Sequence, residues 1–360
     1  MDATLERYLE RNNIQLSWYL DQAASSRINR RFARVCKDDV DTSSLVGAEW
    51  VDWLPNFISL PASMKLKGLD LFEQGSIFGI DAASGFVVRA LAPSPGEAVL
   101  DLCCAPGGKL CMMAELMNHR GTLIGVDASL DRMRTCSKLC RKYKVPCTDS
   151  HWDFVLAVVD GTKFFNPYAL DSRIIWDSVS ESMLSSFSKQ RRVNKSLRCR
   201  INKAQEFLRA NRCHEEFSFD KVLVDAECTH DGSLKHMEKY APGGVFDGAH
   251  FPDTCNYFES IELQKLQRAL ILNGFKLLRP GGFMIYSTCS FCVAQNEAIV
   301  SWLLKNEKDA SLVSLSEVSF TQHPVPLCKS TVLPGTIRFE PRLSRTSGLF
   351  VAKISKLSVV

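Results

Sequence analysis

From about residue 67 the sequence alternates short apolar runs with segments of helical periodicity, and this alternation constrains the fold more than any other feature. Short apolar runs suit buried parallel strands, and the helical segments supply the crossover connections that parallel strands need. The clearest helical segments span 109–118 and 263–278. The pattern predicts an open, doubly wound α/β sheet. The five predicted strands span 98–102, 122–127, 155–159, 221–225 and 283–287.

Three segments depart from this regular alternation. Residues 1–66 lack it, which predicts a small N-terminal region before a larger α/β domain at 67–360. The apolar run 348–354 predicts a further strand at one edge of the sheet. The interval 164–218 is too long for a simple crossover, so we interpret it as an insertion. Within it, residues 189–212 carry nine basic side chains and one acid, and apolar residues recur at roughly helical spacing. We predict an amphipathic basic helix there, whose charge favours contact with phosphates.

Composition excludes secreted and membrane proteins from the expected classes. The first residues include acids and no apolar signal core, and no apolar run approaches the roughly 20 residues that span a bilayer. We therefore expect a cytoplasmic or nuclear location, with the 14 cysteines reduced. Cys289 and Cys292 form a CxxC pair, but no second pair stands at zinc-site spacing, so we predict no metal. The net charge of +4 says little about partners.

The segment Asp101–Lys109, DLCCAPGGK, is the strongest candidate for a ligand site. It follows the first strong strand and opens a helix, where open α/β sheets bind nucleotide-like ligands. Its adjacent glycines allow close approach of a ligand to the backbone. The segment matches neither GxxxxGK[ST] nor GxGxxG, which disfavours a pyrophosphate. Asp127 and Asp160 follow the next two strands, where carboxylates can bind ribose hydroxyls and an adenine amine. The pattern predicts a nucleoside cofactor.

Two cysteines follow the next two strand ends, Cys228 in DAEC and Cys289 in STCS. Such a pair suits methylation at C5 of cytosine, because a thiolate that adds to C6 makes C5 nucleophilic enough to accept a methyl group. A base must then remove the C5 proton so that the thiolate can leave. A nearby carboxylate such as Asp225 can hold the amino group and N3. These residues alone do not decide which cysteine attacks.

The ordered motifs resemble the Sun-domain family of RNA cytosine-5 methyltransferases, also called NOL/NOP/Sun or Fmu-like. The resemblance covers roughly residues 45–356 and implies a class I, Rossmann-like, S-adenosylmethionine-dependent fold. It rests on DLCCAPGGK, Asp127 with Arg132, Asp160-Gly161, DAEC, LLRPGGFMIYSTCS, Asn296-Glu297, GLFVAKI and the entry motif at 75–84.

The resemblance also implies a role for each matching residue. Cys289 would be the nucleophile that bonds covalently to C6, and Cys228 would assist proton removal and product release. Asp225 would serve both catalysis and binding. The residues implied to line the S-adenosylmethionine and cytosine site are Cys103, Cys104, Ala105, Pro106, Gly107, Gly108, Lys109, Asp127, Arg132, Asp160 and Asp225.

Two positions depart from the family pattern: Glu227 replaces a proline before Cys228, and Ile80 replaces a glutamine in the entry motif. Neither change removes a reacting group. We expect an RNA partner, with tRNA first and rRNA second, no membrane and a monomer. RNA recognition would fall to the N-terminal region and the basic insertion. Two alternatives stay open: amino-group methylation, suggested by Phe165-Asn166-Pro167-Tyr168, and a non-catalytic RNA-binding or assembly factor with the same fold.

Overall fold

The computed structural model describes residues 10, 12, 30–36, 40–146, 151–166, 174–177, 217–233 and 260–358. The predicted basic helix at 189–212 lies outside these ranges, as does most of the segment before residue 30. The chain divides into two compact units. The first comprises 1–90, 225–272 and 285–357, and the second comprises 91–224, 273–284 and 358–360. The predicted boundary at residue 66 stays a prediction.

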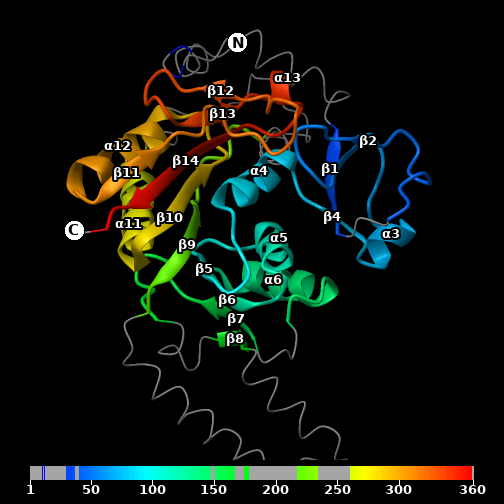
Figure 1. Cartoon of the computed structure of the whole chain (residues 1–360), viewed down its shortest axis with the longest axis horizontal. Helices are drawn as coiled ribbons and strands as arrows, with labels where there is room; N and C mark the ends of the chain where they lie inside the picture. Colours follow the sequence, from blue (N-terminus) through cyan, green and yellow to red (C-terminus); the bar gives the residue numbers. More distant parts are fainter. Residues whose placement is uncertain are drawn as a thin grey trace, which may run out of the picture. The chain divides into compact units, whose positions relative to one another are not determined.

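The second unit contains the parallel core of the sheet. Its strands pair in the order β9-β5-β6-β7, all parallel, and β8 adds to β7 in antiparallel orientation. The helices α5 and α6 connect β5 to β6 and β6 to β7, and they pack against each other (Figure 1). The elements are β5 (Ala98–Asp101), α5 (Gly108–Leu116), β6 (Gly121–Asp127), α6 (Leu130–Lys142), β7 (Trp152–Val158), β8 (Ile174–Asp177) and β9 (Phe219–Asp225).

The strand order explains where a ligand can bind in this unit. Strands β5, β6 and β7 proceed in one direction, whereas β9 returns to the other side of β5. The order therefore reverses beside β5, and the loop that follows β5 lies at the carboxyl edge where open α/β sheets bind ligands. Val99 and Leu100 of β5 are fully buried, as are Leu123 and Ile124 of β6, which agrees with strands covered on both faces.

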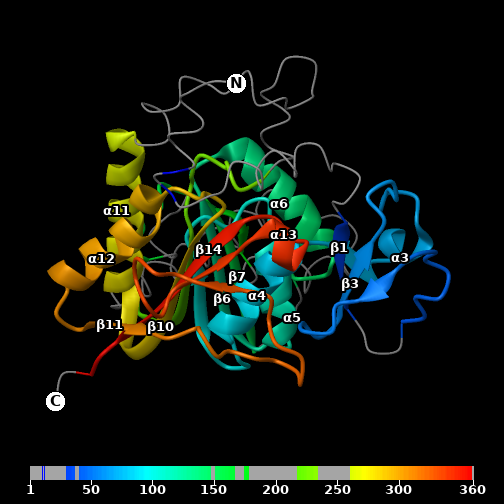
Figure 2. The same ribbon diagram turned by 90° about the horizontal axis from the view of Figure 1, so that it is seen from above.

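The first unit begins with an antiparallel sheet in the order β2-β3-β1-β4. Figure 2 labels β1 and β3 of this sheet. Its small core includes Ala33, Val35, Ile58 and Leu60. Ile80, the apolar replacement in the entry motif, is buried at 9% exposure directly after β4. The elements are β1 (Arg31–Val35), β2 (Glu49–Trp50), β3 (Phe57–Leu60), α3 (Asp70–Glu73), β4 (Ile77–Gly79) and α4 (Ala82–Leu91).

The rest of the chain extends the main sheet, and β11, β12, β13 and β14 pair with one another in antiparallel orientation. Its elements are α11 (Ile261–Leu277), β10 (Leu278–Thr288), η4 (Val293–Gln295), α12 (Glu297–Asn306), β11 (Ala310–Val313), β12 (Cys328–Lys329), β13 (Ile337–Phe339), α13 (Pro341–Ser344) and β14 (Leu349–Lys356). Neighbouring strands of the whole sheet run β12-β13-β14-β10-β9-β5-β6-β7-β8, with β11 also paired to β14. The predicted α/β class with a mostly parallel central sheet is confirmed.

The prediction of an edge strand at 348–354 is wrong. Strand β14 pairs with β13 on one side and with β11 further along, and β10 is its other neighbour. Its residues Leu349–Ala352 are buried, as expected of an interior strand. The error arose because β11, β12 and β13 have only two to four residues each, too few to show a period in the sequence.

Candidate active site

The loop after β5 turns sharply into α5, and Gly107 makes this turn possible. Gly107 has a φ of 106°, a left-handed conformation that residues with side chains rarely adopt. A Cβ atom there would also lie 2.8 Å from Sγ of Cys136 on α6. The glycine thus seats the start of α5 against α6. The backbone N–H groups that begin α5 therefore lie at the carboxyl edge of the sheet.

Asp127, at the end of β6, organises the same loop although it is only 4% exposed. Its Oδ1 accepts a hydrogen bond from the backbone N–H of Ser129 at 2.9 Å, and its Oδ2 accepts one from Ala105 at 3.3 Å. Arg132 lies 3.5 Å from Oδ2 and donates to the Ala105 carbonyl at 2.6 Å. Three of the predicted residues, Ala105, Asp127 and Arg132, therefore lie together. A carboxylate has about four acceptor sites, so capacity remains for a ligand hydroxyl.

Asp160 follows β7 and is the more exposed of the two predicted carboxylates. Its Oδ1 accepts hydrogen bonds from the backbone N–H and hydroxyl of Thr162, at 3.0 and 2.7 Å. Partial burial opposes ionisation, but the Thr162 bonds and the Lys163 ammonium hold the pKa of Asp160 below its usual value. The carboxylate is therefore ionised at neutral pH and accepts hydrogen bonds only.

The remaining loop residues differ in what their side chains offer. Cys104 is buried, and its Sγ lies 3.5 Å from Sδ of Met133. Burial raises the pKa of the Cys104 thiol well above its usual range, so this side chain packs rather than reacts. Cys103, Gly108 and Lys109 are half-buried, and Pro106 is exposed, so the loop surface is accessible. Its backbone donors and the two nearby carboxylates suit a nucleoside.

Two cysteines of the first unit, Cys228 and Cys289, lie in direct contact. Sγ of Cys228, after β9, is 3.4 Å from Sγ of Cys289, after β10. Cys228 is only 4% exposed, whereas Cys289 is half-buried. Burial raises the pKa of the Cys228 thiol well above its usual range, and the neighbouring sulfur of Cys289 adds to this effect. Cys228 is therefore a thiol at neutral pH, and Cys289 is the more accessible sulfur.

A histidine that the sequence reasoning missed completes this cluster. Nδ1 of His230 lies 2.9 Å from Sγ of Cys289 and 3.7 Å from Sγ of Cys228. The sequence position of His230 could have indicated it, because this histidine stands two residues after Cys228 and follows the same predicted strand. Within the described residues these three side chains are close enough together to hold a metal ion, because the two sulfur atoms and a ring nitrogen of His230 lie within 4.8 Å of one another.

Asp225 is the last residue of β9, three residues before Cys228, and neighbouring groups hold its side chain by hydrogen bonds. Its Oδ1 accepts a hydrogen bond of 2.6 Å from the hydroxyl of Ser287, on β10. The backbone N–H of Ala226 donates to the Ser287 carbonyl at 2.9 Å, which extends the pairing past the end of β9. The carbonyl of Glu227 accepts from Nε2 of Gln267 at 2.8 Å, while the Glu227 side chain is exposed. The glutamate that replaces proline thus keeps a fixed backbone and adds an exposed charge.

Gly232 ties the loop of Cys228 to the loop of Cys289. Its N–H donates to the Cys289 carbonyl at 2.8 Å, and its own carbonyl accepts from the N–H of Gly348 at 2.8 Å. A Cβ atom on Gly232 would lie 2.7 Å from the Cys289 carbonyl oxygen. Only a glycine therefore permits this approach without a shift of the backbone.

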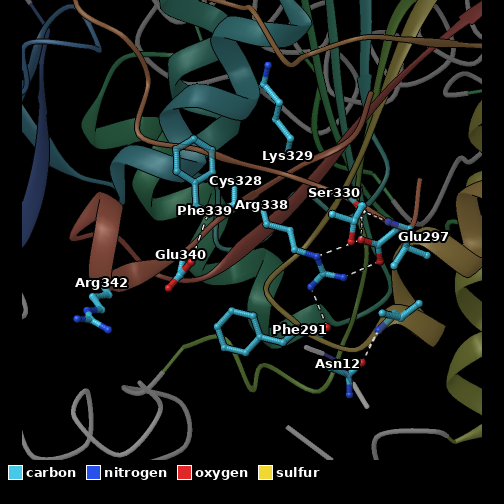
Figure 3. Close-up of a pocket in the computed structure, with 13 residues that line it drawn as sticks. Asn12, Phe291, Glu297, Cys328, Lys329, Ser330, Arg338, Phe339, Glu340 and Arg342 are labelled. Carbon is cyan, nitrogen blue, oxygen red and sulfur yellow. Dashed lines mark hydrogen bonds and ion pairs between the residues drawn. The ribbon is translucent and has the colours of Figure 1, made fainter. Parts of the chain in front are cut away.

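A pocket of about 390 Å³ lies beside the loop that carries Cys289, and Figure 3 shows the residues that line it. Arg338 of β13 reaches across it, donating to both carboxylate oxygens of Glu297 and, at 2.8 Å, to the carbonyl of Phe291. Ser330 donates to the same carboxylate at 2.8 Å. Glu297 is 1% exposed, so this pair is buried. Since Phe291 is two residues from Cys289, the pair anchors the loop that carries the cysteine.

Comparison with known proteins places this chain in a family. Residues 88–164 and 255–355 match the family described as 16S rRNA methyltransferase RsmB/F. The chain belongs to this family. The match includes the loop after β5, Asp127, Asp160 and Cys289, and the resemblance inferred from the motifs is confirmed. S-adenosylmethionine is the cofactor expected of such methyltransferases, and the residues of the β5 loop suit it.

Curated relatives are identical to the chain at about a quarter of the aligned positions. The tRNA (cytosine(49)-C(5))-methyltransferase of Pyrococcus abyssi is 26% identical over 289 residues, which cover 79% of this chain and 72% of that protein. The 25S rRNA (cytosine-C(5))-methyltransferase nop2 of Schizosaccharomyces pombe is 27% identical over 294 residues. These cover 78% of this chain and only 37% of the yeast protein. The chain thus spans well under half of the yeast relative.

Solved structures share the fold. A methyltransferase homolog protein from Pyrococcus horikoshii superposes with a TM-score of 0.60 at 22% identity, covering 99% of this chain and 100% of that one. NSun6 from Pyrococcus horikoshii with SFG gives a TM-score of 0.67 at 16% identity, covering 98% of this chain and 97% of that one.

None of the described helices is both long and apolar enough to span a membrane.

Proposed function

We propose that this chain is an S-adenosylmethionine-dependent RNA (cytosine-5-)methyltransferase that attacks C6 of its target cytosine with Cys289. The observation that carries the proposal is the pair of cysteines at 3.4 Å after two neighbouring strands. Methyl transfer to C5 needs one sulfur to attack and a second group to help release the product. A sulfur pair beside a carboxylate, in a chain of this family, supplies these groups.

The different burial of the two sulfurs supports their assignment. Cys289 is half-buried, so a cytosine can approach it, whereas Cys228 is 4% exposed. Because burial keeps Cys228 protonated at neutral pH, its S–H can donate toward the sulfur of Cys289 and stabilise a departing thiolate. Asp225, fixed by Ser287, is the candidate to hold the amino group and N3 of the base. The roles of all three residues are part of this proposal.

The cofactor residues are proposed on the same basis. When bound, S-adenosylmethionine supplies an electrophilic methyl group. The loop Cys103–Lys109 would hold it through backbone groups, and Asp127 would accept hydrogen bonds from its ribose. Asp160 would accept one from its adenine amine. Arg132 acts indirectly, because it fixes the Ala105 carbonyl and the Asp127 carboxylate.

We propose tRNA as the first substrate and rRNA as the second. Relatives that match the chain include enzymes named for each, the Pyrococcus abyssi tRNA methyltransferase and the fission yeast rRNA methyltransferase. In either RNA the target cytosine must be unpaired or flipped out of its helix, since the thiolate must reach C6. Bisulfite sequencing of RNA from cells lacking the protein would identify the substrate. A non-catalytic RNA-binding factor is the alternative, and it would change no methylation.

The decisive experiment compares three cysteine variants incubated with RNA and labelled S-adenosylmethionine. Cys289→Ala should abolish both methylation and the covalent RNA adduct seen on denaturing gels. Cys228→Ala should accumulate that adduct, because attack proceeds while release fails. Cys292→Ala is the matched control, a buried cysteine three residues from Cys289 that should stay active. Adduct formation by Cys289→Ala would contradict the assignment, and no label transfer by the parent protein would contradict the proposed function.

A further inference from the structure

His230 adopts an unusual backbone conformation that brings its side chain to the sulfur of Cys289. Its φ is 58°, a left-handed value that is unfavourable for a non-glycine residue. The turn is held by its neighbours: the N–H of Ser233 donates to the His230 carbonyl at 2.9 Å, and Gly232 bonds to the Cys289 carbonyl. Such strain persists where the surroundings fix it, commonly at functional sites.

The distance between His230 and Cys289 indicates a direct hydrogen bond. Nδ1 and Sγ are 2.9 Å apart. Two ligands of one tetrahedral zinc ion would lie about 3.5 Å apart, given bonds of about 2.0–2.3 Å to nitrogen and sulfur. The observed contact is shorter than that, although the three side chains are close enough together to surround an ion. The geometry therefore favours a proton shared between imidazole and thiol.

The charges around His230 make its imidazole a stronger base. A hydrogen bond with the Cys228 sulfur raises the pKa of His230, burial lowers it in part, and the carboxylates of Asp225 and Glu227 raise it further. Among the described residues, the titratable groups around the imidazole include the two cysteines and these two carboxylates. Glu227, which replaces the proline of the family pattern, contributes one of the two charges. An imidazolium beside a sulfur stabilises the thiolate, as in other cysteine–histidine pairs.

We propose that His230 is the catalytic base that activates Cys289. This inference rests on the proposed function, since it assigns the origin of the attacking thiolate. The S–H bond of Cys289 breaks, its proton moves to Nδ1 of His230, and the electron pair left on sulfur forms the bond to C6 of cytosine. Once C5 carries the methyl group, a base takes the C5 proton, which is lost to water. The C5–H electron pair then restores the C5=C6 double bond, and the S–C6 bond returns its electron pair to sulfur. The imidazolium then returns the proton, so His230 and Cys289 end as they began.

Alkylation of Cys289 by iodoacetamide tests this pairing without any methyl transfer. We would compare the parent chain with His230→Asn and His230→Gly, because asparagine and glycine both tolerate a positive φ. At pH 6.5 both variants should react about tenfold or more slowly than the parent, since an isolated thiol ionises near pH 8.5. At pH 9.5 the rates should converge. Added imidazole should partly restore the RNA methylation of His230→Gly at neutral pH.

His119→Asn is the matched control, because His119 also has a positive φ, of 50°, and lies in the other unit. It should leave the alkylation of Cys289 unchanged, with mass spectrometry of the peptide separating Cys289 from Cys292. Equal alkylation of the parent and both His230 variants at pH 6.5 would overturn the inference, as would faster alkylation of the parent after chelation of metals. A parent that methylates no RNA but needs His230 for alkylation would refute the proposed function alone.

Discussion

The buried ion pair beside the pocket gives a quantitative test of how the Cys289 loop is held. Replacing Arg338 with methionine removes its bonds to Glu297 and to the Phe291 carbonyl but keeps an unbranched apolar stem. Glu297, at 1% exposure, would then keep only the hydroxyl of Ser330 at 2.8 Å. A buried carboxylate that loses its partner costs about 3–5 kcal/mol. Urea denaturation followed by circular dichroism should show a loss of this size in the free energy of unfolding.

A second ion pair provides the control. Arg279 and Asp220 are 48% and 21% exposed, and an exposed pair contributes about 0–1 kcal/mol, so Arg279→Met should change stability little. The double variant Arg338→Met with Glu297→Met should recover most of the loss, because no charge stays buried. Equal losses for the two single arginine variants would refute this reasoning. A double variant no more stable than Arg338→Met would refute it too.

Three further predictions concern binding and chemistry. Asp127→Asn should weaken S-adenosylhomocysteine binding about tenfold or more in calorimetry, since a charged acceptor is lost; unchanged affinity would remove Asp127 from the cofactor site. Gly232→Ala should slow single-turnover methyl transfer without changing cofactor affinity, because its Cβ would meet the Cys289 carbonyl at 2.7 Å. Removing residues 189–212 should weaken RNA binding and flatten its dependence on salt. Unchanged affinity at low salt would show that this segment makes no phosphate contacts.

Much of the parallel sheet could be predicted from the sequence because its strands are buried on both faces. Runs such as 98–102 and 122–127 are apolar throughout, so composition alone marks them, and β5 and β6 lie there. The carboxyl edge of a parallel sheet then follows from chain direction. For this reason Asp127 and the β5 loop could be assigned to one site, and the structure brings Ala105, Asp127 and Arg132 together.

Other features depend on contacts that no local pattern records. The contact of His230 with Cys289 joins residues 59 positions apart and requires a left-handed turn. The role of Gly107 was also only partly predictable. Its flexibility suggested close approach of a ligand, whereas the structure adds a packing reason, the sulfur of Cys136 at 2.8 Å from its would-be Cβ. The interior position of β14 depends on short partner strands that carry too few residues to form a pattern.

The interior position of β14 also bears on how the chain folds during synthesis. Strands β10, β11 and β13 emerge from the ribosome before residues 349–356, yet β14 is the strand that lies next to all three. Until it emerges, these strands present unpaired edges, which are prone to pair with other chains. The first unit is also assembled from three separate stretches of sequence, whereas most of the second is continuous. The parallel core can therefore form early, while the unit that contains Cys228 and Cys289 must wait for β14.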